Sequence, residues 1–405
     1  MRAEPSPPAR LLDLSRSVSR IGQGPTGIDR VERAYLDAFL ADPAPLFGLV
    51  RTAAGFLLLD EAGCRLLAEG PGPGGWGDAG LLSRLGTRQG DAAAAESALR
   101  RAAVARVPRR GLGWLLRRHL PAGAATFHVG HAALEARLAR TLANAAGGGF
   151  TVMIHDVIPL EHPEWQRGRA PERMRTLLRA AHAHATRLVY PTQSVREASE
   201  ARMAPWGRPP PALVVPLGIE VAAPDPQWRP PLPEDRPHFV SVGTLEPRKN
   251  HVLLLDAWEH LAREMPVDRL PRLYLCGARG WADPALFRRL DALRPGGIVR
   301  ELTGLGDAAL SALVSRARAM LFPSLAEGTG LPPLEAAALG TLPLCTALPV
   351  YRETLGDNAV YLPGTDSYEW AQKIMGLCEP GGASVSAPIE PPTWQDHFNV
   401  LLGRM

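Results

Sequence analysis

The sequence predicts an α/β protein of two domains, each built on a parallel sheet covered by helices. Short apolar runs typical of buried strands alternate with stretches of helical periodicity along the chain. The 405 residues are enough for two domains of ordinary size. A proline-rich polar stretch at 221–236 has the composition of a linker. It separates a first domain at 1–220 from a second at 237–392, and we expect a closing helix at 393–405 to pack back on the first domain.

The composition is that of a globular chain with a small excess of positive charge. The net charge is +4, which permits an anionic partner such as a nucleotide but does not indicate a nucleic acid. The four cysteines show no metal-binding spacing, so we expect free thiols in a reducing cytoplasm. The start of the chain lacks the apolar run of a signal peptide, and no run of about 18 apolar residues predicts a membrane span.

In the first half, a helix is predicted from Gly27 onwards because apolar residues recur there at helical spacing. The loop before it matches GxGxxG at Gly22, Gly24 and Gly27, a pattern found in dinucleotide sites. Pro25 interrupts the pattern, and no acidic residue follows about 20 positions on. We reject this site, so an NAD(P)-dependent oxidoreductase is kept only as an alternative. Strands are predicted at 11–14, 47–51, 55–59, 125–129, 151–154, 187–194 and 213–219.

An arginine-rich region spans residues 100–118, where Trp114, Leu115 and Leu116 stand among the basic side chains. Such a segment could hold the chain at a membrane surface, near a lipid-linked acceptor. The alternative, which we favour, is a half-buried helix with one solvated face.

Polar residues follow two predicted strands of the first half. His131 comes after the strand at 125–129, and His155 with Asp156 comes directly after the strand at 151–154. Open α/β sheets present ligand-binding groups at the carboxyl ends of their strands. These residues are therefore candidate ligand contacts, with Glu161 nearby, although His155 could also be a satisfied structural residue.

In the second half, the segment HFVSVGTLEPRKN at 238–250 predicts a strand that ends before Gly243 and a turn that carries Arg248 and Lys249. The chain has two lysines and therefore 45 − 2 = 43 arginines, so a lysine in this turn stands out. An ammonium beside a planar guanidinium suits a diphosphate. The alternative is a pair of solvated turn charges.

A second segment, LFPSLAEGTGLPPLEAAALG at 321–340, predicts a strand, a loop with two glycines and a helix that begins near Pro332 and ends before Gly340. A helix N-terminus offers free N–H groups and the positive end of a dipole, which suit phosphate oxygens. Glu327 precedes the loop and Glu335 lies one turn inside the helix, where both carboxylates can accept hydrogen bonds from ligand hydroxyls.

The pair GTLEPRKNH and EGTGLPPLE, with two glutamates eight positions apart, resembles the C-terminal half of the retaining glycosyltransferases of family 4. The resemblance covers most of residues 237–365. It implies a GT-B fold, in which two Rossmann-like domains face each other across a cleft, and a nucleotide-sugar donor. The family more often has an aromatic residue where Thr329 stands.

What the resemblance implies for the site can be written residue by residue. Arg248 and Lys249 neutralise the diphosphate, Glu327 holds the transferred sugar, and His155 lines the sugar pocket. Asp156, Glu161 and His131 are weaker candidates for acceptor contacts. No metal is implied, since no DxD motif stands in a suitable loop. The expected donor-binding residues are Gly27, Gly243, Thr244, Gly328, Thr329, Gly330, Leu331 and Glu335.

The variant PRKNH looks most like mannosyl- and rhamnosyltransferases of bacterial surface-polysaccharide synthesis. It therefore implies a GDP-linked sugar as donor and a glycan or lipid-linked acceptor, used in the cytoplasm or at the inner membrane. A non-catalytic nucleotide-sugar-binding scaffold of a polysaccharide assembly complex would keep the same binding groups and remains a second alternative.

Overall fold

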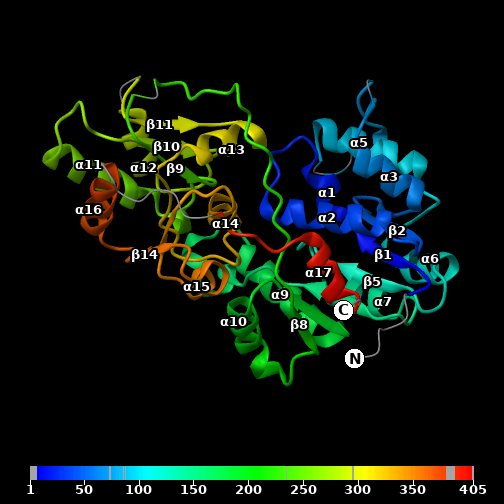
Figure 1. Ribbon diagram of the computed structural model, residues 1–405. Coiled ribbons are helices and arrows are strands. Elements are labelled where there is room, and N and C mark those ends of the chain that lie inside the picture. Colours follow the sequence, from blue (N-terminus) through cyan, green and yellow to red (C-terminus); the bar gives the residue numbers. More distant parts are fainter. Residues whose placement is uncertain are drawn as a thin grey trace.

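The computed structural model describes residues 7–72, 74–84, 86, 88–233, 235–293, 296–379 and 388–403. Within them the chain forms two halves, each centred on one sheet (Figure 1), with the first coloured blue to green and the second green to orange. The expectations for residues 1–6, 380–387 and 404–405 lie outside the described residues.

The sheet of the first half has the strand order β4-β3-β2-β1-β5-β6-β7-β8 in the described residues. Its strands from β2 through β1 to β8 are parallel, whereas β3 and β4 are antiparallel to their neighbours. The bounds are Arg10–Asp13 (β1), Leu46–Thr52 (β2), Gly55–Leu59 (β3), Ala105–Val107 (β4), Ala125–His128 (β5), Phe150–Met153 (β6), Arg187–Tyr190 (β7) and Ala212–Val214 (β8).

The sheet of the second half is parallel throughout the described residues, with the order β11-β10-β9-β12-β13-β14. The reversal of order beside β9 places the ends of β9 and β12 next to each other. The strands are His238–Val242 (β9), Arg272–Cys276 (β10), Val299–Leu302 (β11), Ala319–Phe322 (β12), Pro343–Thr346 (β13) and Val360–Leu362 (β14).

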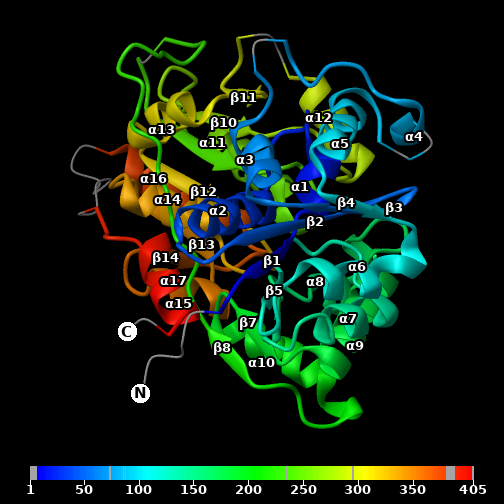
Figure 2. The same ribbon diagram turned by 90° about the vertical axis from the view of Figure 1, so that its right-hand side faces the viewer.

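Helices cover both faces of each sheet (Figures 1 and 2). In the first half they are Ser15–Arg20 (α1), Gly27–Ala41 (α2), Glu61–Glu69 (α3), Leu81–Arg84 (α4), Gly90–Ala102 (α5), Leu112–His119 (α6), Ala136–Ala143 (α7), Ile158–Glu161 (α8), Ala170–His184 (α9) and Gln193–Met203 (α10). In the second half they are His251–Glu264 (α11), Pro284–Asp291 (α12), Asp307–Ser315 (α13), Leu331–Ala338 (α14), Pro349–Leu355 (α15), Ser367–Cys378 (α16) and Trp394–Leu401 (α17). Short 3₁₀ turns lie at Arg109–Gly111, Pro163–Trp165, Ala204–Trp206 and Pro247–Lys249.

The predicted α/β architecture is confirmed, with three local differences. The strand predicted at 213–219 is shorter, because β8 ends at Val214, just before Pro216, which has no N–H to donate. The first sheet is mixed, because a two-residue connection after Thr52 turns the chain back into β3 as a hairpin. Gly55 makes this turn at φ +132°, and a Cβ there would lie 2.0 Å from the carbonyl oxygen of Val107. The strand predicted at 187–194 ends at Tyr190, because Thr192 caps α10 by accepting a hydrogen bond from the N–H of Val195.

The core of the first half lies on both faces of its sheet. Leu11 belongs to the cluster that faces α6, α7 and α9, whereas Leu12 belongs to the cluster that faces α2 and α17. This alternation follows from the two-residue period of a strand. Each sheet is thus buried between two layers of helices. Polar side chains therefore lie mainly at the carboxyl ends of its parallel strands.

The last helix, α17, packs on the first half although it follows the second in sequence (Figure 1). Thr393 caps it through a capping box with Asp396. Phe398 lies 4.9 Å, centroid to centroid, from the ring of Tyr35 on α2. The hydroxyl of Tyr35 is 2.8 Å from Nε2 of His397. The chain therefore crosses from the second half back to the first, and α17 helps to hold α2 in place.

The arginine-rich region spans the end of α5, the strand β4, a 3₁₀ turn and α6, and its helix α6 is half-buried with a solvated face. Leu115 and Leu116 of α6 are fully buried, whereas Trp114 is 61% exposed. Arg100 is directed inward on α5, where it pairs with the buried Glu96. Among the described residues, no helix combines the length and apolar character needed to cross a membrane.

Candidate active site

The two basic residues of the second half lie in the turn between β9 and α11. Lys249 is buried, and its Nζ lies 4.2 Å from the centroid of the Phe322 ring, as in a cation–π contact. Gly243 has φ +143°, and a Cβ there would lie 3.3 Å from Cε of Lys249. The glycine therefore leaves room for the lysine side chain to reach the interface between the halves, while the next residue, Thr244, is exposed.

Arg248 and Lys249 converge on one carboxylate. Oε1 of Glu327 lies 2.6 Å from Nη1 of Arg248 and 2.6 Å from Nζ of Lys249. Nη2 of Arg248 lies 2.7 Å from Oε1 of Glu246. Burial would raise the pKa of Glu327, but the two cations outweigh it and hold the pKa at about 2. Glu327 is thus ionised and balances the positive pair.

The glycine loop after Glu327 touches the first half directly. A Cβ on Gly328 would lie 2.2 Å from the carbonyl oxygen of His155, so only glycine allows this approach. The hydroxyl of Thr192 donates to the carbonyl of Gly328 at 3.2 Å. Gly330 has φ +77° and precedes α14 as its N-cap residue. The loop with Thr329 therefore lies against the segment that carries His155.

Two helix N-termini meet beside this loop. A Cβ on Gly27, the first residue of α2, would lie 3.1 Å from Cδ1 of Leu331, the first residue of α14. The positive ends of both dipoles and their free N–H groups are therefore close together, which favours a negatively charged ligand between them.

His155 is a neutral, buried histidine. Its Nε2 lies 2.6 Å from the carbonyl oxygen of Val129, which requires this nitrogen to carry the proton. Burial lowers the pKa of His155 to about 4, and the charge of Arg16 acts in the same direction. The backbone N–H of His155 donates to Nε2 of His131 at 3.1 Å. Within the described residues no hydrogen bond uses Nδ1 of His155, so this nitrogen can accept one from a ligand.

A cavity of about 250 Å³ opens between the two halves beside these residues. Asp156, Glu161 and Glu327 line it together with Ser194 and apolar side chains such as Val350. Burial raises the pKa of Asp156 to about 6, against the opposing charge of Arg248. Carboxylates beside apolar surface are suited to bind the hydroxyls and the C–H faces of a sugar.

Glu335 lies away from the basic pair, although it belongs to the same motif as Glu327. Its Oε1 is 2.9 Å from Nη1 of Arg30 on α2. The structure thus divides the two glutamates between different partners. Glu327 faces the Arg248–Lys249 pair, and Glu335 faces a separate hollow between α2, α13 and α14.

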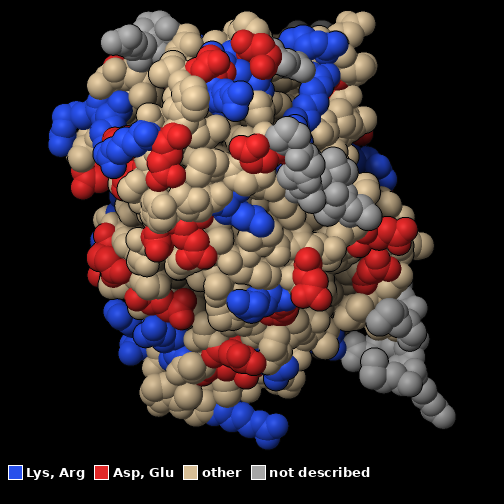
Figure 3. All heavy atoms as spheres, turned by 60° about the vertical axis from the view of Figure 1, so that its left-hand side comes forward, with Lys and Arg blue, Asp and Glu red and all other residues tan. Residues whose placement is uncertain are grey.

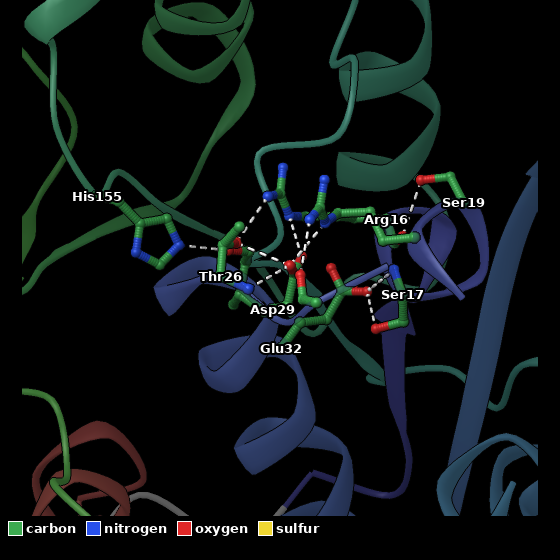
Figure 4. A network of polar contacts seen from close by, with 10 residues as sticks. Arg16, Ser17, Ser19, Thr26, Asp29, Glu32 and His155 are labelled. Carbon is green, nitrogen blue, oxygen red and sulfur yellow. Dashed lines mark hydrogen bonds and ion pairs between the residues drawn. The ribbon is translucent and has the colours of Figure 1, made fainter. Parts of the chain in front are cut away.

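The loop at Gly22–Gly27 is held by a network of polar contacts (Figure 4). Asp29 accepts hydrogen bonds from Arg16, Arg20 and Thr26 at 2.6 to 2.8 Å. Helix α1 lies between β1 and this loop. A dinucleotide fingerprint joins a strand directly to a helix, so the geometry also excludes that role for the GxGxxG match.

A second polar cluster lies behind this loop. Ser17 donates from its N–H and its hydroxyl to Oε1 of Glu32, while Oε2 of Glu32 has no hydrogen-bond partner in the described chain. A Cβ on Gly130 would lie 1.6 Å from that Oε2. Asp13 and His128 are paired nearby at 2.9 Å. Glu32 is therefore a buried carboxyl that receives only part of its hydrogen bonds.

Sequence reasoning missed several residues of this site. Glu246 pairs with Arg248 two positions on, inside the GTLEPRKN segment, so its closeness to Arg248 was a usable signal. Thr192, Arg16 and Arg30 gain their place only through partners that are distant in the chain. They gave no such signal, because periodicity does not report contacts between distant segments. Within the described residues no group of three or more His, Cys, Asp or Glu side chains has the arrangement of a metal site.

Comparison with known proteins finds sequence relatives for part of the chain. Residues 225–381 match the family described as "Glycosyl transferases group 1". The "Serotype-specific mannosyltransferase WbdA" of Escherichia coli is 30% identical over 278 residues, which cover 64% of this chain and 34% of that protein. The "O-antigen chain mannosyltransferase B" of Escherichia coli is 39% identical over 129 residues, 32% of this chain and 33% of that protein. This chain spans about a third of the length of these relatives.

The fold has solved counterparts. A structure described as "Trehalose-6-phosphate from E. coli bound with UDP-2-fluoro glucose" matches 98% of this chain and 96% of its own, with a TM-score of 0.57 and 16% identity. At this identity the likeness shows the fold alone, and it is a GT-B fold. Residues 225–381 thus match the group 1 glycosyl transferases, and the chain is homologous to bacterial O-antigen mannosyltransferases.

The surface charge is mixed on the face that Figure 3 shows. Lys and Arg side chains are interspersed there with Asp and Glu, rather than gathered into one basic patch. Binding of a nucleic-acid backbone relies on clustered positive charge, which this face does not present.

We predict that Glu32 makes the unfolding free energy fall as the pH rises from about 4.5 to 7. Burial raises the pKa of Glu32 to about 7, and the charge of Asp13 adds to this, so the folded chain retains a proton that the unfolded chain has lost. Glu32→Gln should remove this dependence. Between pH 4.5 and pH 8, the unfolding free energy of the variant should rise by up to about 3 kcal/mol relative to that of the wild type. Urea unfolding at each pH measures this difference. Glu61→Gln on the exposed face of α3 is the control, and parallel pH curves for all three proteins would contradict the prediction.

Proposed function

We propose that the chain is a retaining glycosyltransferase, which moves a sugar from a nucleoside-diphosphate donor to a hydroxyl of a glycan or lipid-linked acceptor. The observation that carries the proposal is the convergence of Arg248 and Lys249 on Glu327 where the two halves meet. The match to the group 1 glycosyl transferases and the O-antigen mannosyltransferases among the relatives support this class of reaction. The names of these relatives also support mannose as the sugar, whereas GDP as its carrier is inferred from the PRKNH segment alone.

In this proposal the diphosphate lies against the basic pair. Arg248 offers a planar fork and Lys249 a compact charge, and both stabilise the negative charge that builds on the leaving phosphate. The N–H groups at Gly330 and Leu331, and those at Gly27 on the facing helix, add further donors. The glycine loop after Glu327 and Gly243 lie on the same side of the proposed diphosphate site.

The transferred sugar is proposed to occupy the cavity of about 250 Å³. Glu327 accepts hydrogen bonds from its hydroxyls, and the neutral His155 accepts one at Nδ1. Asp156 and Glu161 reach the acceptor side of this cavity, whereas His131 positions His155 through the backbone N–H. Glu335 accepts hydrogen bonds from the ribose hydroxyls in the neighbouring hollow.

The proposed reaction takes place on one face of the sugar. The bond between the anomeric carbon and the phosphate oxygen breaks, and a bond from the acceptor oxygen forms on the same side. The proton of the acceptor hydroxyl passes to the leaving phosphate. No carboxylate of this chain acts as a covalent nucleophile, and the positive charge is supplied by Arg248 and Lys249. The four cysteines are free thiols, which supports a reducing compartment such as the cytoplasm.

Thermal unfolding in the presence of GDP, UDP, dTDP, ADP and NAD tests the binding part of the proposal. We expect one nucleoside diphosphate, GDP first, to raise the unfolding temperature, because a ligand that binds the folded chain stabilises it. Lys249→Ala should lose this shift. A shift with NAD and with none of the diphosphates would contradict the proposal.

A second prediction separates a role of Glu327 at the transferred sugar from a role at the nucleoside diphosphate. Glu327→Gln should lower turnover about 100-fold, as expected for the loss of a group that acts on the reacting sugar. The affinity for the nucleoside diphosphate should not fall, because the substitution removes a negative charge that competes for Arg248 and Lys249. Turnover and calorimetric affinity are measured on the same preparations.

The control for this pair of measurements is Glu259→Gln, an exposed carboxylate that pairs with Arg289 on the surface of the second half. It should change neither quantity. An equal loss of turnover and nucleotide affinity in Glu327→Gln would place Glu327 at the nucleotide rather than at the sugar.

A further inference from the structure

One arginine of the first half reaches across the interface to the second. Arg30 lies on the first turn of α2, and its Nη1 is 2.9 Å from Oε1 of Glu335 on α14. Its Nη2 is 2.9 Å from Oδ1 of Asp307, the first residue of α13. The guanidinium therefore holds two carboxylates of the other half at once.

The neighbouring arginine on the same helix has no such role. Arg33 pairs with Asp37, one turn further along α2, at 2.6 Å. Of the two, only Arg30 is directed at the other half. The difference follows from position, because Arg30 stands three residues after Gly27, on the side of α2 that approaches α14 at Leu331.

The contact lies at the wall of a hollow that a ligand can reach. Arg30, Asp307 and Glu335 line both a cavity of about 390 Å³ and a smaller one beside it. The side chain of Arg30 is 38% exposed and that of Glu335 is 21% exposed. Burial raises the pKa of Glu335, and Arg30 opposes this rise. Arg30 therefore favours the charged form of Glu335 while it occupies one of its oxygens.

We propose that Arg30 is a latch that the donor displaces: its bond to Glu335 holds the two halves together and competes with the ribose hydroxyls for the same carboxylate. This inference rests on the proposed function, in which Glu335 accepts the hydroxyls of the ribose. When the donor binds, the hydroxyls take Oε1 of Glu335, and Arg30 keeps only its contact with Asp307. The latch thus weakens the affinity for the donor and links donor binding to the contact between the halves.

The size of the effect follows from the exposure of the pair. Ion pairs that are open to water contribute little, about 0.2 to 1 kcal/mol. Removing the competitor should therefore tighten nucleotide binding by a factor of about two to five.

Calorimetry with two matched ligands tests the latch. The ligands are GDP, or whichever ribonucleoside diphosphate stabilises the chain most, and its 2′,3′-dideoxy analogue, which lacks both ribose hydroxyls. Arg30→Ala should bind the ribonucleotide about two to five times more tightly than the wild type, and it should bind the dideoxy analogue with unchanged affinity. Arg30→Gln, which removes the charge but keeps a polar side chain, should behave alike. Arg33→Ala is the matched control and should change neither affinity.

Other results would overturn the latch in distinguishable ways. Weaker binding of the ribonucleotide by both Arg30 variants would make Arg30 a ligand of the donor instead of its competitor. Equal tightening for both ligands would show that the competition does not pass through the ribose hydroxyls. If the wild type binds the dideoxy analogue as tightly as the ribonucleotide, Glu335 does not hold the ribose, and both the latch and that part of the proposed function fail.

Discussion

Two positive charges held side by side where two domains meet are the constraint on which the rest of this structure depends. Arg248 and Lys249 are largely withdrawn from water, and each would destabilise the other without nearby negative charge. Glu327 and Glu246 supply that charge. They reach it because the switch in strand order places the ends of β9 and β12 next to each other, the position at which open α/β sheets bind ligands. A diphosphate satisfies the same two cations, so their arrangement suits the ligand that we propose.

The contact between the halves is distributed over separate points. Besides Arg30, Glu353 on α15 accepts hydrogen bonds from the N–H and the hydroxyl of Ser194, at 3.0 and 2.8 Å, at the start of α10. The indole N–H of Trp281 donates to the carbonyl of Trp165 at 2.8 Å. Each of these contacts is polar, and polar domain interfaces permit relative motion.

The fold was predictable from local patterns, and much of the site was predictable from two short motifs. The helix predicted from Gly27 begins at that residue, and the strand predicted at 55–59 has those bounds, because periodicity and turn residues act locally. The antiparallel direction of β3 was not predicted, since an apolar run carries no strand direction. Arg30 and Glu335 are 305 residues apart, and no spacing rule relates them. The motif placed Glu327 and Glu335 together, but only the folded chain shows that they face different partners.

Direct observation of the product's anomeric configuration tests the central claim, that this site transfers a sugar with retention. The purified chain would be incubated with an α-linked nucleoside-diphosphate sugar, GDP-mannose first, and the released sugar or the glycoside formed with a mannose acceptor would be followed by proton NMR. The account predicts release of the nucleoside diphosphate together with an α-configured first product, and loss of both in Glu327→Gln. A β-configured first product would contradict retention. Tight binding of every donor without transfer or hydrolysis would identify the chain as a nucleotide-sugar-binding scaffold instead.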